Sequence, residues 1–169
     1  MKKNNFKSRS NKKKVPDILI LGIGNFLLGD EGIGVHMVHF FEKMKLPGNV
    51  TLLDGGTGGF HLLSHLECYH HIILIDATID EKPEGSIEVT TPTFASDFPP
   101  SLSAHEIGLK DLIETLYLLN KNPSITLLTV SIKNIQPMSV ELSARIRRIQ
   151  KKVADRTIQI IREINGNYS

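Results

Sequence analysis

Short, continuous apolar runs recur along most of the chain. Such runs occupy residues 18–23, 50–53, 72–75 and 125–130, and they are rich in isoleucine, valine and leucine. This pattern is typical of strands that are buried on both faces of a sheet. A further strand is predicted at 86–90, after Glu84-Gly85 and before a proline-broken loop.

Helices are predicted in the segments between these strands. Apolar residues at helical spacing predict a helix over 33–44, a short helix at 60–66 and a third over 109–116. A long amphipathic helix is expected from about 140 to 164. Because strands and helices alternate, we predict a single α/β domain whose mostly parallel, twisted sheet of about five strands carries helices on both faces.

Composition and charge restrict what this domain does. Apolar residues make up 40% of the 169, and charged residues 22%, as in ordinary globular domains. Seven basic residues and no acidic ones lie in residues 1–16, and the remainder has 13 basic against 18 acidic residues. We therefore predict a disordered, solvated tail at 1–16 and the domain at 17–169. The acidic body argues against nucleic-acid binding.

The chain also lacks the signals of export and of membrane insertion. No apolar run of signal-peptide length follows the basic tail, and no stretch approaches the length that spans a bilayer. The single cysteine, Cys68, rules out an internal disulfide and is expected to be a small buried hydrophobe. We predict a monomer in a reducing cytoplasm.

Acidic residues follow the first three predicted strands. Asp30-Glu31 comes after the first, Asp54 closes the second and Asp76 closes the third. The carboxyl ends of parallel strands meet at one edge of a sheet, where ligands bind. These residues therefore mark a candidate site.

The glycine-rich segment 22–32 resembles two nucleotide-binding loops without matching either. A dinucleotide fingerprint needs a third glycine where Leu27 stands. A phosphate-binding loop needs lysine and serine or threonine where Asp30 and Glu31 stand, and two carboxylates repel phosphate. The sequence thus disfavours phosphate binding.

Each acidic residue has a structural and a chemical interpretation. Asp30 is favoured as the N-cap of the helix that follows, and Glu31 as a carboxylate kept ionised by the helix dipole and able to bind a cation. Asp76 is expected to bind a metal or to be paired, the alternative being a turn-forming aspartate. Asp54 precedes two glycines that permit a tight turn and close approach of another chain.

Among seven histidines, His105 is the candidate metal ligand. Ser103 and Glu106 match a capping box, which places His105 in the first turn of a helix as a neutral ring. The zinc-protease motif is excluded, because Leu109 stands where it requires a second histidine. The other six histidines are expected to be structural or to lie on the surface. Glu31, Asp76 and His105 suit a divalent transition metal, with zinc, nickel and manganese left open.

The ordered motifs resemble the hydrogenase maturation endopeptidases over roughly residues 18–164. The resemblance rests on these blocks: Gly22-Ile23-Gly24-Asn25, Leu28-Gly29-Asp30-Glu31-Gly32-Ile33-Gly34-Val35, Asp54-Gly55-Gly56-Thr57, Ile75-Asp76-Ala77 and Ser103-Ala104-His105-Glu106-Ile107-Gly108-Leu109. Members of that family remove the C-terminal extension of the nickel-loaded precursor of a nickel–iron hydrogenase large subunit. Segment 131–138 departs from the family pattern and keeps only its proline.

The resemblance implies roles for individual residues. The nickel-binding trio falls on Glu31, Asp76 and His105, with nickel supplied by the substrate precursor, although other divalent ions could occupy the site. Asp54, Glu31 and Asp76 would be the catalytic carboxylates of an aspartic-type or metal-assisted endopeptidase. The alternatives are a non-catalytic, nickel-dependent docking protein and a different peptidase on the same fold.

Overall fold

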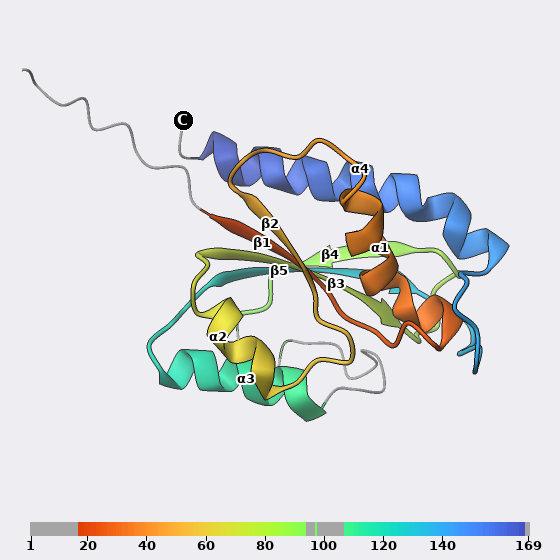
Figure 1. Cartoon of the computed structure of the whole chain (residues 1–169), viewed down its shortest axis with the longest axis horizontal. Coiled ribbons are helices and arrows are strands. Elements are labelled where there is room, and N and C mark those ends of the chain that lie inside the picture. The colour runs from red at the N-terminus through yellow and green to blue at the C-terminus, as the bar shows by residue number, and fades with distance from the viewer. Residues whose placement is uncertain (1–16, 94–96, 98–106, 168–169) are drawn as a thin grey trace, which may run out of the picture.

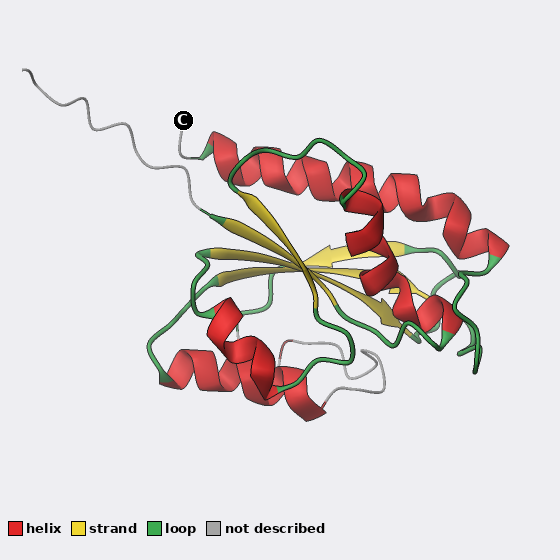
Figure 2. Ribbon diagram, viewed as in Figure 1, coloured by secondary structure: helices red, strands yellow, loops and turns green. Residues whose placement is uncertain are grey.

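The computed structural model describes residues 17–93, 97 and 107–167, and its strands form one five-stranded sheet (Figures 1 and 2). The strand order is β2-β1-β3-β5-β4. All neighbours are parallel except β4, which pairs antiparallel with β5 at the edge. The strands are β1 (Ile18–Gly22), β2 (Val50–Asp54), β3 (His71–Thr78), β4 (Ile87–Thr90) and β5 (Ser124–Ser131).

Helices cover both faces of the sheet, as the sequence predicts. One face carries α1 (Ile33–Phe41) and α4 (Ala144–Gly166), and the other carries α2 (Leu63–Leu66) and α3 (Ile107–Leu118) (Figure 1). Two short 3₁₀ helices, η1 (Gly29–Gly32) and η2 (Phe60–Leu62), lead into α1 and α2. In the described ranges none of the helices is long and apolar enough to cross a membrane.

The continuous apolar runs are explained by burial on both faces. In β1, Ile18 and Ile20 pack with α1 and α4, while Leu19 and Leu21 pack with α2 and α3. Successive side chains of a strand point to opposite faces, so a strand between two helical layers needs apolar residues at every position.

Two glycines bring α1 into contact with the strand backbones. A Cβ on Gly34 would lie 2.2 Å from the carbonyl oxygens of Ile23 and Ile75, and one on Gly22 would lie 2.1 Å from the Gly34 oxygen. The helix therefore starts directly against the end of β1 and against the residue of β3 that pairs with it, Ile75. This contact places η1 at the carboxyl edge of the sheet.

Three predicted boundaries are wrong. Helix α1 ends at Phe41 rather than near Met44, because the Met44 N–H turns back to the Phe41 carbonyl oxygen at 2.9 Å. Helix α4 begins at Ala144 rather than 140, because the Ser143 hydroxyl accepts from the Ile146 N–H and caps the helix. Strand β3 continues to Thr78 rather than ending at Asp76, since β5 pairs with it beyond the end of β1.

Candidate functional site

Three buried carboxylates lie at the carboxyl edge of the sheet. Asp30 is 0% exposed, and Glu31 and Asp76 are 1% exposed. Burying a charge is costly unless it is paired, hydrogen-bonded or bound to a metal. The surroundings of each carboxylate therefore indicate its role.

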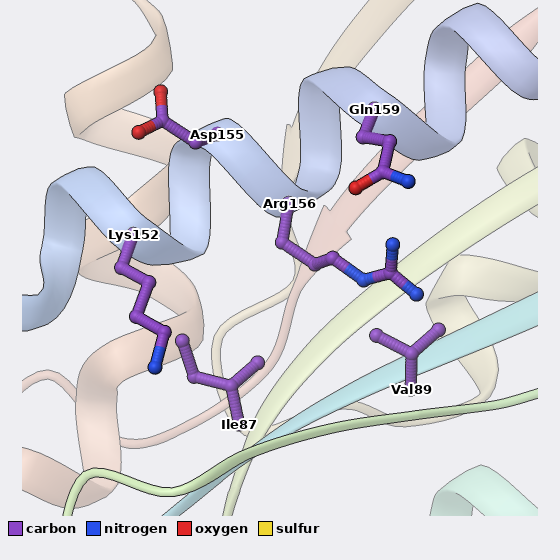
Figure 3. A pocket seen from close by; sticks show the side chains of 6 residues that line it. All are labelled: Ile87, Val89, Lys152, Asp155, Arg156 and Gln159. Atoms are coloured by element: carbon purple, nitrogen blue, oxygen red, sulfur yellow. The ribbon is translucent and has the colours of Figure 1, made fainter.

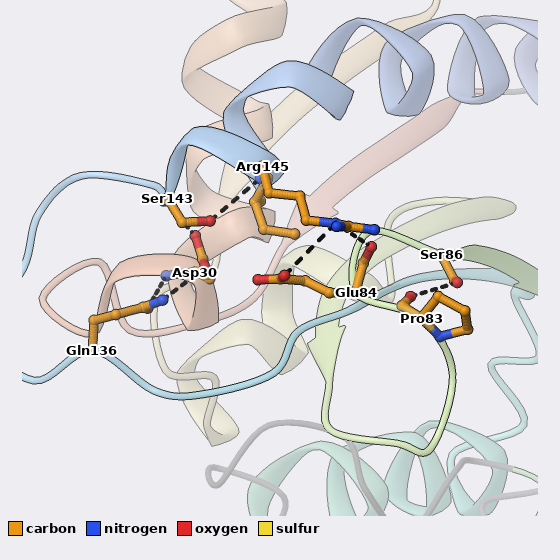
Figure 4. A network of polar contacts seen from close by, with 8 residues as sticks. Asp30, Pro83, Glu84, Ser86, Gln136, Ser143 and Arg145 are labelled. Carbon is orange, nitrogen blue, oxygen red and sulfur yellow. Dashed lines mark hydrogen bonds and ion pairs between the residues drawn. The ribbon is translucent and has the colours of Figure 1, made fainter.

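The carboxylate of Asp30 is held by two distant segments (Figure 4). Its Oδ2 accepts from Nε2 of Gln136 at 2.7 Å, and its Oδ1 accepts from the Ser143 N–H at 2.7 Å. The side-chain oxygen of Gln136 in turn accepts from the Asp30 N–H at 2.8 Å. No side chain caps η1 or α1, so the expected role of Asp30 as a helix cap is wrong. Asp30 instead fixes its loop to the segment before α4.

Glu31 follows β1 on η1, which packs against β3. The backbone N–H of Asn25 donates to the Glu31 carboxylate. Gly24 has φ 139°, and a Cβ there would lie 2.2 Å from the Glu31 carbonyl oxygen. The loop after β1 thus folds tightly over Glu31, which holds the carboxylate at the end of the strand.

Asp76 lies within β3, one residue beyond the last position that pairs with β1. Its Oδ1 accepts from the Ala77 N–H at 2.8 Å, and its backbone is opposite Thr129 of β5. Because the strand continues, the alternative interpretation as a turn-forming aspartate is wrong. By alternation the side chain shares the face of Ile72 and Leu74, which pack with α2 and α3.

Asp54 ends β2 and is half-exposed, at 44% of its side chain. Its Oδ1 accepts from the Gly56 N–H at 2.8 Å, which makes the expected tight turn. Its Oδ2 lies 3.6 Å from Nε2 of His39 on α1. Asp54 therefore lies toward the face covered by α1 and α4, whereas Asp76 lies toward the face covered by α2 and α3. Both residues are at the carboxyl edge of the sheet.

The third predicted metal ligand, His105, and its capping neighbours Ser103 and Glu106 lie outside the described residues. Within the described part of the chain, no three histidine, cysteine, aspartate or glutamate side chains form a group that could hold a metal. Glu31 and Asp76 supply two carboxylate donors, so the predicted trio stays a prediction that needs His105.

Sequence reasoning missed two contacts beside the site. His39 meets Asp54, and His36 stacks on Phe26 with ring centroids 4.6 Å apart. Burial, and then the proximity of His39, lower the pKa of His36 below its ordinary value of 6.5. Helical spacing puts both histidines on α1, but nothing local in the sequence indicates their partners across the fold.

Cys68, expected to be buried, is exposed, because α2 has ended before it.

One pocket lies away from the buried carboxylates, and none of the predicted catalytic residues lines it (Figure 3). It has a volume of about 400 Å³ between β4 and α4, and Lys152, Asp155 and Arg156 line it together with Ile87, Val89 and Gln159. None of Glu31, Asp54 and Asp76 lines this pocket. We therefore retain the carboxyl edge as the candidate site.

Known proteins resemble the chain in both sequence and fold. A family model described as hydrogenase maturation protease matches residues 35–161. The hydrogenase 2 maturation protease of Escherichia coli K12 is 31% identical over 150 residues, which cover 86% of this chain and 91% of that protein. The hydrogenase expression/formation protein HupD of Rhizobium leguminosarum is 29% identical over 151 residues, which cover 87% of this chain and 75% of that protein.

The fold agrees with a solved structure of the same kind of protein. The hydrogenase maturating endopeptidase HybD from E. coli superposes with a TM-score of 0.79 at 31% identity. The match covers 86% of this chain and 92% of that one.

Proposed function

Because the chain belongs to the hydrogenase maturation protease family, we propose that it removes the C-terminal extension from a nickel-loaded hydrogenase large-subunit precursor. The observation that best supports this proposal is the pair of buried carboxylates, Glu31 and Asp76, at the carboxyl edge of the parallel strands. Ligands of such sheets bind at this edge. A location in a reducing cytoplasm fits the single cysteine, which has no disulfide partner in the chain, and we propose that the protein acts there as a monomer.

Nickel enters this proposal as part of the substrate. Glu31, Asp76 and His105 would complete the coordination of an ion that the precursor holds, and two carboxylates with an imidazole suit a divalent transition metal. The N–H groups of Asn25 and Ala77 bind the two carboxylates and fix their orientation before the substrate arrives. Such pre-orientation lowers the entropic cost of binding.

Cleavage requires a water molecule to attack the peptide carbonyl carbon while a base takes its proton. The C–N bond then breaks, and the leaving amine is protonated. Asp54 is the carboxylate we propose as base, since it is half-exposed and can reach solvent, whereas Glu31 and Asp76 are buried. An aspartic-type base and a water polarised by the precursor's nickel are the two catalytic types that this arrangement accommodates.

Mass spectrometry of the large subunit tests this function. The purified protein is incubated with nickel-loaded and with nickel-free precursor, and we expect loss of the C-terminal peptide only from the loaded form. Glu31→Gln should abolish cleavage and weaken binding of the loaded precursor more than about tenfold, because an amide is a poorer ligand for a transition metal. Glu42→Gln, which removes a charge from the exposed end of α1, is the matched control.

Two other outcomes would replace the proposal. Binding of the loaded precursor without release of a peptide would indicate a docking protein. Equal cleavage of loaded and nickel-free precursor would indicate a peptidase that does not recognise nickel. Cleavage by Glu31→Gln at the parent rate would remove Glu31 from the site.

A further inference from the structure

Two loops form one continuous surface beside Glu31. The Gly29 N–H donates to the Ser139 carbonyl oxygen at 2.7 Å, and the Ser139 N–H donates to that of Leu27 at 3.0 Å. Leu28 and Ser139 form a parallel bridge. Together with the pairing of Asp30 and Gln136, these bonds fix segment 134–140 to the loop that carries Glu31.

The outer side of this surface is apolar. Leu27 is 56% exposed, Val140 is 50% exposed and Met138 is 93% exposed, and Phe26, which precedes Leu27, is 37% exposed. We call Phe26, Leu27, Met138 and Val140 the apolar rim. Segments 25–28 and 134–140 contain no charged residue. Hydrogen bonds from the two backbones hold this rim in place, so it is ordered without being covered.

Met138 adopts a backbone conformation that long side chains rarely take. Its φ is 60°, in the left-handed region, and it is one of two non-glycine residues with positive φ in the described part of the chain. The surrounding bonds of Ser139 keep this conformation while the side chain points into solvent. Strained positions that the fold maintains cluster at functional sites. Methionine is a flexible side chain that is enriched at protein interfaces.

We propose that the apolar rim is the docking surface for the protein substrate, and that it binds an uncharged, apolar surface of the precursor next to the cleaved segment. The inference rests on the proposed function. The occupant follows from position, because the rim continues through Leu28 and Gly29 into Asp30-Glu31, so a folded substrate that reaches Glu31 covers it. The absence of charge on both segments favours an apolar protein surface over an acidic or basic one.

The proposal also assigns a role to the segment that departs from the family pattern. Residues 131–138 run from the end of β5 into the rim, and Gln136 anchors them. Changes in this segment at positions other than Gln136 would alter which precursor binds and leave the carboxylates in place. The segment is therefore a specificity element in addition to a connection between β5 and α4.

A double substitution tests the rim while protecting the fold. Leu27→Ser with Met138→Gly removes two apolar side chains, and glycine adopts the φ of 60° without strain. The matched control is Leu119→Ser with Asn120→Gly, which removes a leucine of similar exposure (51%) and relaxes the other positive φ, 53°, just after α3. That control lies near the start of β5, at the opposite edge of the sheet.

Binding of nickel-loaded precursor is measured by calorimetry, and cleavage by mass spectrometry. We expect the rim variant to bind at least about tenfold more weakly and to raise KM with little change in kcat, while the control variant matches the parent. Unchanged binding by the rim variant, with cleavage retained, would overturn the docking surface and leave the proposed function standing. No binding by the parent would overturn both, and a parent dimer that the rim substitutions dissociate would show that a second copy covers the rim.

Discussion

Asp30 and Gln136, 106 residues apart in sequence, pair through both the backbone and the side chain of the aspartate. The Gln136 amide donates to the Asp30 carboxylate at 2.7 Å, and its oxygen accepts from the Asp30 N–H at 2.8 Å. Because Asp30 is fully buried, each of these bonds replaces water that the aspartate has lost. The loop of Glu31 is thus held by a residue that is distant in the sequence.

Replacing Gln136 by leucine should destabilise the protein. The substitution leaves an N–H and a carboxylate oxygen of Asp30 without this partner, which costs about 2–3 kcal/mol. Urea denaturation measures the change in free energy of unfolding. Gln159→Leu removes an exposed hydrogen bond to Glu163 on α4 and should change it by less than about 0.5 kcal/mol. Equal effects of the two substitutions would contradict a structural role for the buried pair.

Asp30→Asn should be nearly as damaging, although asparagine is a good helix cap. Both carboxylate oxygens accept from N–H donors, and the amide would turn an NH₂ group toward one of them. We expect a loss of about 2 kcal/mol. A helix cap would tolerate the change almost fully, so thermal unfolding of this variant distinguishes the two roles.

Gly34→Ala should prevent stable folding or cost about 3 kcal/mol or more. Its Cβ would lie 2.2 Å from two backbone oxygens, so α1 would have to move away from β1 and β3. Gly48→Ala is the control, because a Cβ at Gly48 meets nothing within 4 Å. Circular dichroism and urea titration of the two variants report the difference.

Asp54→Asn should retain stability and lose activity. The amide oxygen can still accept from the Gly56 N–H, and the exposed ion pair with His39 is worth less than about 1 kcal/mol. If the Asp54 carboxylate is the base, the rate of cleavage should fall at least about a hundredfold with the substrate affinity unchanged. A parent-like rate would assign that proton transfer to another group.

Stability should decline as the pH falls below about 6.5, partly because of His36. Burial lowers the pKa of His36, so the unfolded chain binds the proton more readily than the folded one. His71 acts in the same direction, since burial and His70 lower its pKa as well. His36→Phe keeps the stacking on Phe26 and should make the decline shallower in urea titrations between about pH 5 and pH 8.

The sheet could be predicted because its signal is local. Runs such as 18–23 and 72–75 are apolar at every position, which a strand between two helical layers requires. The antiparallel direction of β4 could not be predicted, since four residues at an edge carry no sign of direction. The extension of β3 to Thr78 depends on pairing with β5, a partner that is distant in sequence.

The sequence predicts where on the sheet the candidate site lies, but not the residues that surround each carboxylate. Acidic residues after three strands had to meet at one edge, and Glu31, Asp54 and Asp76 lie there. Their surroundings could not be predicted, because the partners come from elsewhere: Gln136 and Ser143 for Asp30, and His39 for Asp54. The sheet faces of Asp54 and Asp76 follow from register, which periodicity alone does not provide.

The pairing of Asp30 with Gln136 and Ser143 also sets an order of assembly. During synthesis the residues after β1 emerge early, but both partners of the Asp30 carboxylate belong to the last quarter of the chain. A nascent chain that ends before Gln136 lacks both, so the loop carrying Glu31 acquires its native conformation only when the segment leading into α4 has docked. The site therefore matures with the last part of the domain, and a truncated chain would carry the acidic motifs without the geometry that orients them.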